Sequence, residues 1–227
     1  MATAHIAELE RYHRDEVVGC TRCSLSEERT QVVPGNGDPH ADLMFVGEAP
    51  GYHEDRQGVP FVGAAGQLLD QMLGGIGLSR ELVFVANVLK CRPPGNRDPL
   101  PAEIRACEAH LFRQVSLIRP RVVCTLGNFA TKLLSGRPDG ITRVHGHELP
   151  IQLGDLSVLL YPLFHPAAVL RAGALRSALE ADFARIPSLL AADPGEPAPT
   201  VEAVAGPTPA PAAPVAAAGD AEQLDLF

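Results

Sequence analysis

Several features of other protein classes are missing from this sequence. No apolar run is long enough to span a membrane, and the first residues, MATAHIAELERYHRDE, lack the apolar stretch of a secretory signal. No internal repeat stands out either. With 227 residues, the chain is long enough to form one sizeable hydrophobic core. We therefore expect a cytoplasmic protein that makes no contact with a membrane.

Basic residues are missing from residues 191–227, a stretch that contains six acidic residues. The whole chain has a formal net charge of −8, which is unusual for a protein that binds nucleic acid. Without those six acids, 19 basic residues stand against 21 acidic ones, so the remainder is nearly neutral. Because phosphate contacts depend on local charge, a nearly neutral body can still present a basic face. The composition therefore does not exclude a nucleic-acid-binding protein.

Aromatic residues are absent from residues 192–219, where Ala and Pro dominate. Such a segment cannot bury enough apolar area to offset the entropy lost on ordering. An Ala-rich helix is the alternative, but the repeated prolines argue against it. We expect a globular domain over residues 1–190, a disordered tether over residues 191–222 and a separate terminal peptide, residues 223–227.

Strand and helix patterns alternate along the first 190 residues. Short apolar runs predict strands at residues 43–46, 83–86, 122–126 and 158–164. Helical spacing of apolar residues predicts helices at residues 6–18, 66–74, 101–118, 128–134 and 174–190. This alternation predicts an α/β fold with three layers, α/β/α, around a mainly parallel central sheet. Ligand sites in such sheets lie at the carboxyl ends of the strands, so we expect one cleft there.

Three loops that follow predicted strands carry polar residues suited to a binding site. The first, residues 47–63, reads GEAPGYHEDRQGVPFVG and combines acidic side chains with one phenylalanine. The second begins at Asn87 and reads NVLKCRPPGNRDP, and the third begins at His165 and reads HPAAVL. Carboxylates beside a flat ring favour a planar, polar ligand. For the first loop taken alone, a solvated surface turn is an equally good interpretation.

The cysteines suggest a metal site. Cys20 and Cys23 form a CxxC pair, and Cys91 and Cys107 are separated by 15 residues. In a reducing compartment, such cysteines favour metal ligation over disulfides. Four thiolates suit a structural zinc ion or a [4Fe–4S] cluster; spacing alone does not decide between them, and the chemistry by itself slightly favours zinc. The fifth, Cys124, lies within an apolar run and is predicted to be a buried core residue.

Together, the three loops and the four cysteines closely resemble the type-4 uracil-DNA glycosylases, the iron–sulfur branch of that superfamily. The resemblance covers roughly residues 15–190, with the motifs in the family's order. It implies a uracil-DNA glycosylase fold and a monofunctional hydrolase that releases uracil from single- or double-stranded DNA, leaving an abasic site for base excision repair. It also implies a monomer with a structural [4Fe–4S] cluster on Cys20, Cys23, Cys91 and Cys107.

The resemblance assigns roles to residues of the substrate pocket. Phe61 would stack on the flipped uracil, Asn87 would read the edge of the base, and His165 would stabilise negative charge on uracil O2. Taken alone, these residues have simpler interpretations: a core phenylalanine, a strand cap and a structural histidine.

The water-activating residue is harder to assign. Several glycosylases outside this branch have an aspartate where this chain has Ala49, which we place only among the base-contacting residues. Glu48 is the preferred candidate for contact with base and water, and Glu54 and Asn96 are second candidates.

Further residues are expected to face DNA. Basic side chains gather in or beside the motif loops, namely Lys90, Arg92, Arg97, Arg143 and Arg171. Leu170, in the segment that matches the family's minor-groove wedge, would fill the gap left by the flipped base. His145 stands where the family has Arg, which leaves the phosphate contacts of that loop open.

Three other functions are alternatives. A related capture protein binds uracil-DNA covalently through a histidine in an inserted basic loop, but no such insertion separates Asn87 from Cys91. The neighbouring type-5 branch lacks the motif glutamate, which is present here as Glu48. A zinc-stabilised binding module without catalysis would require all three motif loops to be incidental.

The terminal peptide QLDLF predicts a protein partner. Its apolar residues stand alone after the Pro/Ala-rich tether, as in a short docking motif. The peptide closely resembles the pentapeptide by which bacterial polymerases and repair proteins bind the sliding clamp. That resemblance implies a bacterial, nucleoid-associated protein and assigns clamp contacts to Gln223, Leu224, Leu226 and Phe227.

Overall fold

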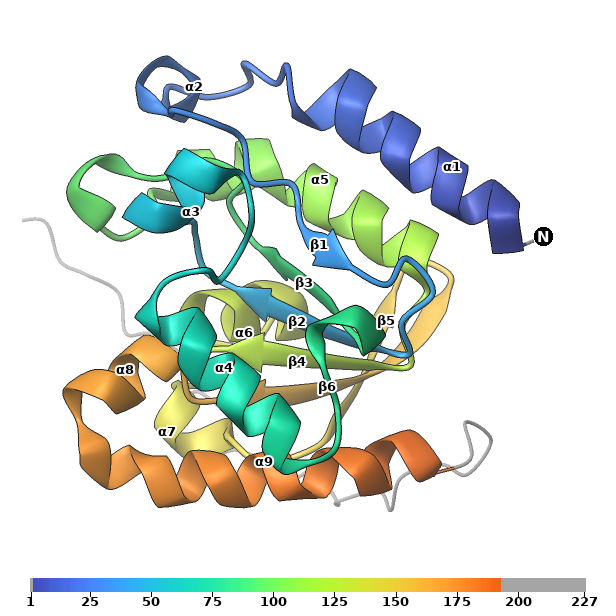
Figure 1. Cartoon of the computed structure of the whole chain (residues 1–227), viewed down its shortest axis with the longest axis vertical. Coiled ribbons are helices and arrows are strands. Elements are labelled where there is room, and N and C mark those ends of the chain that lie inside the picture. The colour runs from blue at the N-terminus through green and yellow to red at the C-terminus, as the bar shows by residue number, and fades with distance from the viewer. Residues whose placement is uncertain (1, 193–227) are drawn as a thin grey trace, which may run out of the picture. The chain divides into compact units, whose positions relative to one another are not determined.

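The computed structural model describes residues 2–192, with side chains from residue 7 onward. Almost all of the expected tether and the whole terminal peptide, including Gln223, Leu224, Leu226 and Phe227, lie outside the described residues. The described part is built around one six-stranded sheet (Figure 1). Its strands, in sheet order, are β1 (Asn36–Gly37), β3 (Phe84–Asn87), β2 (Leu43–Gly47), β4 (Val122–Leu126), β6 (Leu156–Leu163) and β5 (Leu149–Leu153).

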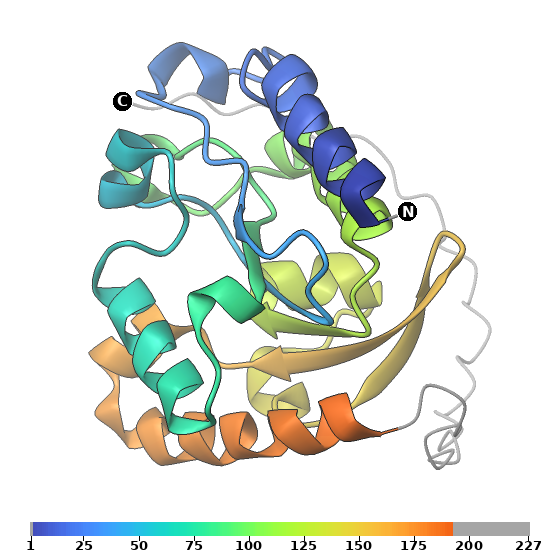
Figure 2. The ribbon, with the colours of Figure 1, turned by 45° about the vertical axis from the view of Figure 1, so that its right-hand side comes forward.

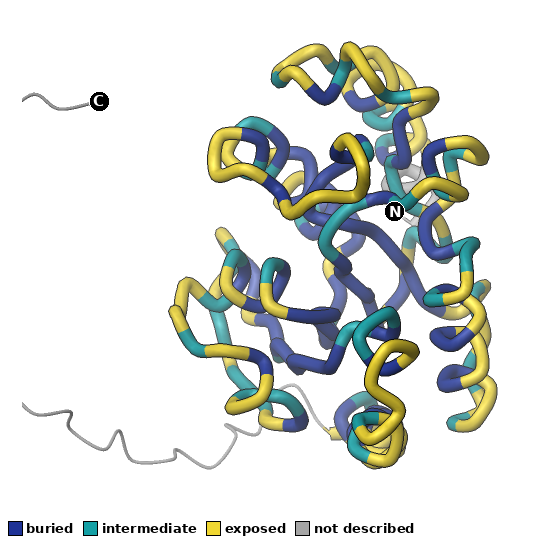
Figure 3. The backbone as a smooth tube through the Cα atoms, turned by 90° about the vertical axis from the view of Figure 1, so that its left-hand side faces the viewer, coloured by how far each residue is buried: buried dark blue, intermediate teal, exposed yellow. Residues whose placement is uncertain are grey.

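The four central strands, β3, β2, β4 and β6, are parallel, and both edge strands pair antiparallel. Every residue of β2, β3 and β4 is buried, as their mainly apolar sequences predict for strands covered on both faces (Figure 3). The predicted mainly parallel sheet is confirmed.

Helices cover both faces of the sheet (Figures 1 and 2). On one face, Met44 and Val46 pack with buried residues of α1 (Ala2–Tyr12), α5 (Pro101–Ile118) and α6 (Asn128–Ser135). On the other, Leu43 and Phe45 pack with α4 (Ala64–Gly75), α7 (Ile141–Val144), α8 (Pro166–Arg171) and α9 (Arg176–Ala191). Alternate residues of β2 thus enter opposite cores, which follows from the two-residue repeat of a strand. The predicted three-layer α/β/α architecture is confirmed.

Four short helices of the described residues were not predicted, and two of them lie within motif loops. The loop of residues 47–63 contains α3 (Tyr52–Gln57), and HPAAVL forms α8. The remaining elements are α2 (Leu25–Glu28), a π-helical turn (His13–Val17) that extends α1, and 3-10 turns at Arg80–Leu82, Pro94–Asn96 and Gly173–Leu175. In the part of the chain that the structure describes, no helix has the length and apolarity needed to cross a bilayer.

Candidate active site and cysteine-lined cavity

The carboxyl ends of the central strands bring the three motif loops together. Gly47 at the end of β2 pairs with Asn87 at the end of β3. The two segments that follow these strands remain hydrogen-bonded to each other. The amide of Val88 donates to the Gly47 carbonyl (2.9 Å), and the amide of Leu89 donates to the Glu48 carbonyl (3.0 Å). Glu48 is therefore held beside Asn87 by backbone hydrogen bonds.

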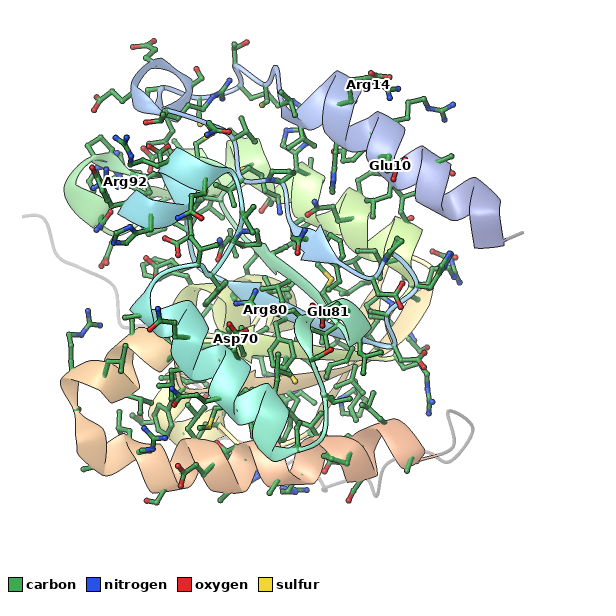
Figure 4. All side chains as sticks on the ribbon, in the orientation of Figure 1. Glu10, Arg14, Asp70, Arg80, Glu81 and Arg92 are labelled. Carbon is green, nitrogen blue, oxygen red and sulfur yellow. The ribbon has the colours of Figure 1, made fainter. Side chains whose placement is uncertain are left out.

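Phe61 is held in a strained backbone conformation. Its φ of 55° lies in the left-handed region, which is uncommon for a bulky residue. Arg80 stabilises this conformation by donating to the Phe61 carbonyl (2.7 Å), and an ion pair holds Arg80 to Asp70 on α4 (Figure 4). A Cβ atom at Gly66 would overlap the same carbonyl group, so this position requires glycine. No local sequence pattern indicates this role of Arg80.

Glu54 supports the same loop from α3. Its Oε1 accepts hydrogen bonds from the amides of Val62 and Gly63, both at 2.9 Å, and its Oε2 accepts from the amide of Gly51 (3.1 Å). Both carboxylate oxygens are therefore engaged with backbone. This position suits the shaping of the Phe61 loop better than activation of water.

His165 is the N-cap of α8, and this fixes its tautomer. The amide of Ala167 donates to Nδ1 of His165 (3.1 Å), so Nδ1 acts as an acceptor and the proton of the neutral ring resides on Nε2. Burial, together with the charge of Arg171, lowers the pKa of His165 to about 4. At neutral pH the side chain is therefore a neutral imidazole whose Nε2–H can donate to a ligand.

Asn87 is 1% exposed, yet neither its Oδ1 nor its Nδ2 has a hydrogen-bond partner in the described structure. Such groups are costly to bury unless something pairs with them. A Cβ atom at Gly47 would lie 2.5 Å from both Asn87 Oδ1 and Phe61 Cζ, so the amide and the ring meet over this glycine. The Phe61 ring in turn stacks with His165 at a centroid distance of 5.7 Å. The structure thus brings together the three residues predicted for base recognition.

Glu48 is half-buried at the edge of this group. Burial and the nearby Asp98 raise the pKa of Glu48, whereas Arg171 opposes that shift. Ala49, next in sequence, has no polar side chain and packs against the core. Asn96 is exposed, and its Oδ1 accepts from Nε of Arg92 (2.6 Å).

The residues predicted to face DNA have different surroundings. Lys90 is 2% exposed and cannot reach phosphate, so its inclusion in the basic group was wrong. Arg97 makes a bidentate ion pair with Glu103, at 2.6 and 2.9 Å, and its predicted DNA contact has to compete with that pair. Arg143 and Arg171 are exposed, and Leu170 is 52% exposed on α8. Their DNA contacts stay predictions.

His145 is engaged with α9. Its Nδ1 lies 2.8 Å from Oδ2 of Asp182, and its ring packs on Phe164 at a centroid distance of 4.2 Å. This histidine, found where the family has Arg, therefore joins its loop to the last helix.

All four predicted ligand cysteines line one cavity between the N-terminal segment, the loop after β3 and α5. Cys91 and Cys107 are buried, and Cys20 and Cys23 are partly buried. Among residues 2–192, no three His, Cys, Asp or Glu side chains lie close enough together to hold a single metal ion. Cys124 is buried in the opposite core, as predicted.

Several donors surround the sulfurs of this cavity. Arg29 donates to Cys91 Sγ (3.3 Å), and the amide of Lys90 donates to Cys107 Sγ (3.2 Å). Nε2 of His110 lies 3.2 Å from Cys20 Sγ. Burial raises the pKa of Cys107 to about 11, so this thiol needs a bound cation to ionise at neutral pH. The donors are suited to stabilising thiolates around a metal centre.

The buried Lys90 connects the cavity to the predicted uracil site. Its Nζ donates to the main-chain carbonyl of Asn87 (2.8 Å) and to Oε1 of Gln114 on α5 (2.6 Å). Through its backbone amide, the same residue contacts Cys107. No local sequence pattern indicates this connection, because Gln114 lies 24 positions from Lys90.

Comparisons with known proteins agree with this geometry. The profile of the uracil DNA glycosylase superfamily matches residues 34–185. The type-4 uracil-DNA glycosylase of Sulfurisphaera tokodaii is 46% identical over 181 residues, which are 78% of this chain and 82% of that protein. The corresponding protein of Archaeoglobus fulgidus is also 46% identical, over 77% of this chain and 89% of its own length.

A type-5 uracil-DNA glycosylase from Thermus thermophilus is more distant. It is 36% identical over 137 residues, which cover 53% of this chain and 62% of that protein. Profile, identity and coverage agree with the motif loops: the chain belongs to the uracil-DNA glycosylase superfamily, in its type-4 branch.

Proposed function

We propose that this protein hydrolyses the N-glycosidic bond of uracil in DNA, releasing uracil and leaving an abasic site from which base excision repair starts. The observation that carries the proposal is the buried amide of Asn87, whose two polar atoms have no partner in the described structure. An amide in this state is suited to a ligand that supplies both a donor and an acceptor. The edge of uracil offers both.

The amide explains selection for uracil. Asn87 Nδ2 would donate to uracil O4, and Asn87 Oδ1 would accept from uracil N3–H. Cytosine has the opposite pattern at these positions, so it would leave buried polar groups unpaired, and that penalty gives discrimination. The Phe61 ring beside the amide supplies the stacking surface for the base. Because uracil in DNA is stacked, it has to be extruded to reach this site.

His165 would act on the departing base. As the bond to the sugar breaks, negative charge grows on uracil O2, and the Nε2–H of His165 is free to donate to it. A preorganised donor of this kind stabilises the transition state more than the ground state. Supporting this role, the ring is neutral and the helix N-cap fixes its orientation.

Glu48 remains our candidate for orienting the attacking water. It is half-buried beside Asn87, and burial and Asp98 raise its pKa against the opposing charge of Arg171, which makes the carboxylate a stronger base. As a carboxylate it could accept a proton from water and offset positive charge developing on the sugar. The Glu54 carboxylate accepts hydrogen bonds from three amides, and Asn96 accepts one from Arg92. Both residues are therefore weaker candidates than Glu48 for orienting the water.

We propose that Cys20, Cys23, Cys91 and Cys107 hold a [4Fe–4S] cluster. The four side chains border one cavity, and four protein thiolates are the usual ligands of such a cluster. The N–H donors around the sulfurs also fit thiolate ligands. Such a cluster would fasten the N-terminal segment to the loop that begins at Asn87.

The function is tested with an oligonucleotide that contains one uracil, followed by treatment with alkali. Turnover gives strand scission, capture gives a complex that resists denaturant, and a binding module gives neither product. Asn87→Ala should lower the excision rate about tenfold to a hundredfold, because two buried hydrogen bonds to the base are lost. Asn87→Asp should be at least as damaging, since it removes the donor to O4 and adds a charge.

Both Asn87 variants should keep the visible colour of the protein, which separates loss of recognition from loss of the cluster. A near-normal excision rate in either variant would mean that another group reads the base. Capture without turnover in the unmodified protein would instead favour the related binding function.

The C-terminal peptide is proposed to bind the sliding clamp, which would keep the enzyme near newly copied DNA. Gln223 and the Leu226–Phe227 pair would fill a pocket on the clamp surface, and tethering would raise the local concentration of the enzyme. A chain ending at Glu222 should lose clamp binding in a titration with purified clamp, while its excision of uracil from free oligonucleotides stays the same. Equal clamp affinity of both chains would rule out this docking role.

A further inference from the structure

We infer that the exposed ring of Tyr52, with the guanidinium groups of Arg56 and Arg92, is a stacking site for an unpaired DNA base next to the extruded nucleotide. This inference rests on the proposed function and adds a second contact site for its substrate. The three side chains come from two loops that Figure 1 shows side by side: Tyr52 and Arg56 lie on α3, and Arg92 follows β3.

Both cations lie close to the ring. Cζ of Arg92 lies 5.3 Å from the centroid of the Tyr52 ring, and Cζ of Arg56 lies 5.8 Å from it. Both distances are within the range of cation–π contact. Despite these neighbours the tyrosine is 50% exposed, so much of its surface is open to solvent. Figure 4 shows Arg92 beside α3, at the outer edge of the molecule.

This surface lies close to the predicted uracil pocket. Tyr52 begins α3, the helix whose Glu54 binds the amides of Val62 and Gly63. The His53 ring, next to Tyr52, comes within 3.6 Å of the position that a Cβ atom would occupy at Gly63. The stacking surface and the Phe61 loop are therefore parts of one connected unit, with the tyrosine exposed and the phenylalanine buried.

The two arginines are available for phosphate or base. Within residues 2–192, neither Arg56 nor Arg92 is in an ion pair, whereas the neighbouring Arg97 is bound to Glu103. Arg92 uses Nε to contact Asn96 and retains its other N–H groups. Guanidinium planes and aromatic rings both stack on bases, and the positive charge of arginine attracts the phosphate backbone of DNA.

An unpaired base is the ligand that best fits this chemistry. Its flat face matches the exposed ring, and the adjoining phosphates match the two cations. A base within a duplex presents only its edge to the groove, so it could not lie flat on Tyr52. The site therefore predicts a preference for single-stranded or locally melted DNA around the uracil.

The test uses the full holoprotein and a single-stranded oligonucleotide with a non-hydrolysable 2′-fluoro-deoxyuridine. The fluorescent base 2-aminopurine is placed at each of the positions flanking the uracil in turn, because stacking on an aromatic ring quenches its emission. Binding should quench 2-aminopurine at one flanking position. Tyr52→Leu should abolish that quenching and weaken single-strand binding about tenfold, and Tyr52→Phe should retain both. With single-stranded DNA that can be cleaved, Tyr52→Leu should lower the efficiency of excision mainly by raising KM.

The control is Phe112→Leu, which alters another exposed aromatic residue, on α5. It should leave quenching and affinity unchanged. Equal weakening of single- and double-stranded binding by Tyr52→Leu, with quenching retained, would overturn the inference and leave the ring a purely structural contact. If the unmodified protein excised uracil but showed no quenching, the stacking site would fail while the proposed function stood. Absence of excision in the unmodified protein would reject the proposed function itself.

Discussion

His165→Ala should lower the rate of uracil excision by about two to three orders of magnitude, the usual cost of removing one preorganised donor to a developing anion. The variant loses the Nε2–H that we assign to uracil O2, an interaction that strengthens as charge develops. DNA binding should fall much less than the rate. Single-turnover excision, measured alongside the dissociation constant for uncleavable DNA, separates the two effects. Equal losses of binding and rate would point to a positioning role.

The same residue gives a pH prediction. Because burial lowers the pKa of His165 to about 4, its ring should remain neutral from pH 8 down to about pH 5. The imidazole signal that is missing from the NMR spectrum of His165→Ala identifies this residue in the unmodified protein. That signal should not move over this range, and a midpoint near pH 6.5 would contradict the assignment.

Stability provides a second readout for His165. Its pKa in the folded protein, about 4, lies below the ordinary value of 6.5, so protons bind the unfolded chain more readily. The stabilisation linked to this group is therefore complete above pH 6.5 and declines as the pH falls toward 4. His165→Ala should lose that part of the pH dependence of unfolding.

Cys107→Ala should cost iron, solubility and excision activity together. The sulfur lies on α5, and its loss would leave a [4Fe–4S] cluster with three protein ligands and would remove the acceptor of the Lys90 amide. Elemental analysis of the unmodified protein, prepared without chelator or oxygen, should give about four irons per chain and a brown colour. The Cys107→Ala protein should be depleted in iron and largely insoluble.

Cys124→Ala is the matched control, because Cys124 is also buried but lies in the opposite core. It should retain full iron content and colour. A colourless, zinc-containing and fully active unmodified protein would reject the cluster. A soluble and active Cys107→Ala variant with unchanged iron would reject this ligand set.

Much of the fold could be predicted because its signals are local. Residues 122–126 are apolar except for Thr125 and are β4, with the predicted bounds. The helix predicted at residues 101–118 has Pro101 in its first turn and Glu103 as a capping residue, and α5 has those bounds. The edge strand β5 was missed, since its residues are only partly buried or exposed and it is stabilised by pairing with β6.

Site residues could be predicted where a residue type within a motif indicates the chemistry. They could not be predicted where their role depends on contacts with residues far away in the sequence. Asn87, Phe61 and His165 follow strands in recognisable motifs, and they lie together in the structure. Arg80 reaches the Phe61 carbonyl over 19 positions, which no local pattern reports. Helix α3 was also missed, because Glu54 stabilises it partly through the amides of Val62 and Gly63, outside the helix itself.

The Lys90 bridge has a consequence for how this loop can vary in length. One residue holds the Asn87 carbonyl with its side chain and Cys107 with its main chain, and the next residue is Cys91. An insertion between Asn87 and Cys91 would place the ammonium group or the ligand sulfur out of register, and no single adjustment would restore both. Insertions and deletions should therefore be tolerated at the β5–β6 turn around Gly154, which lies outside both sites, but not within these five residues.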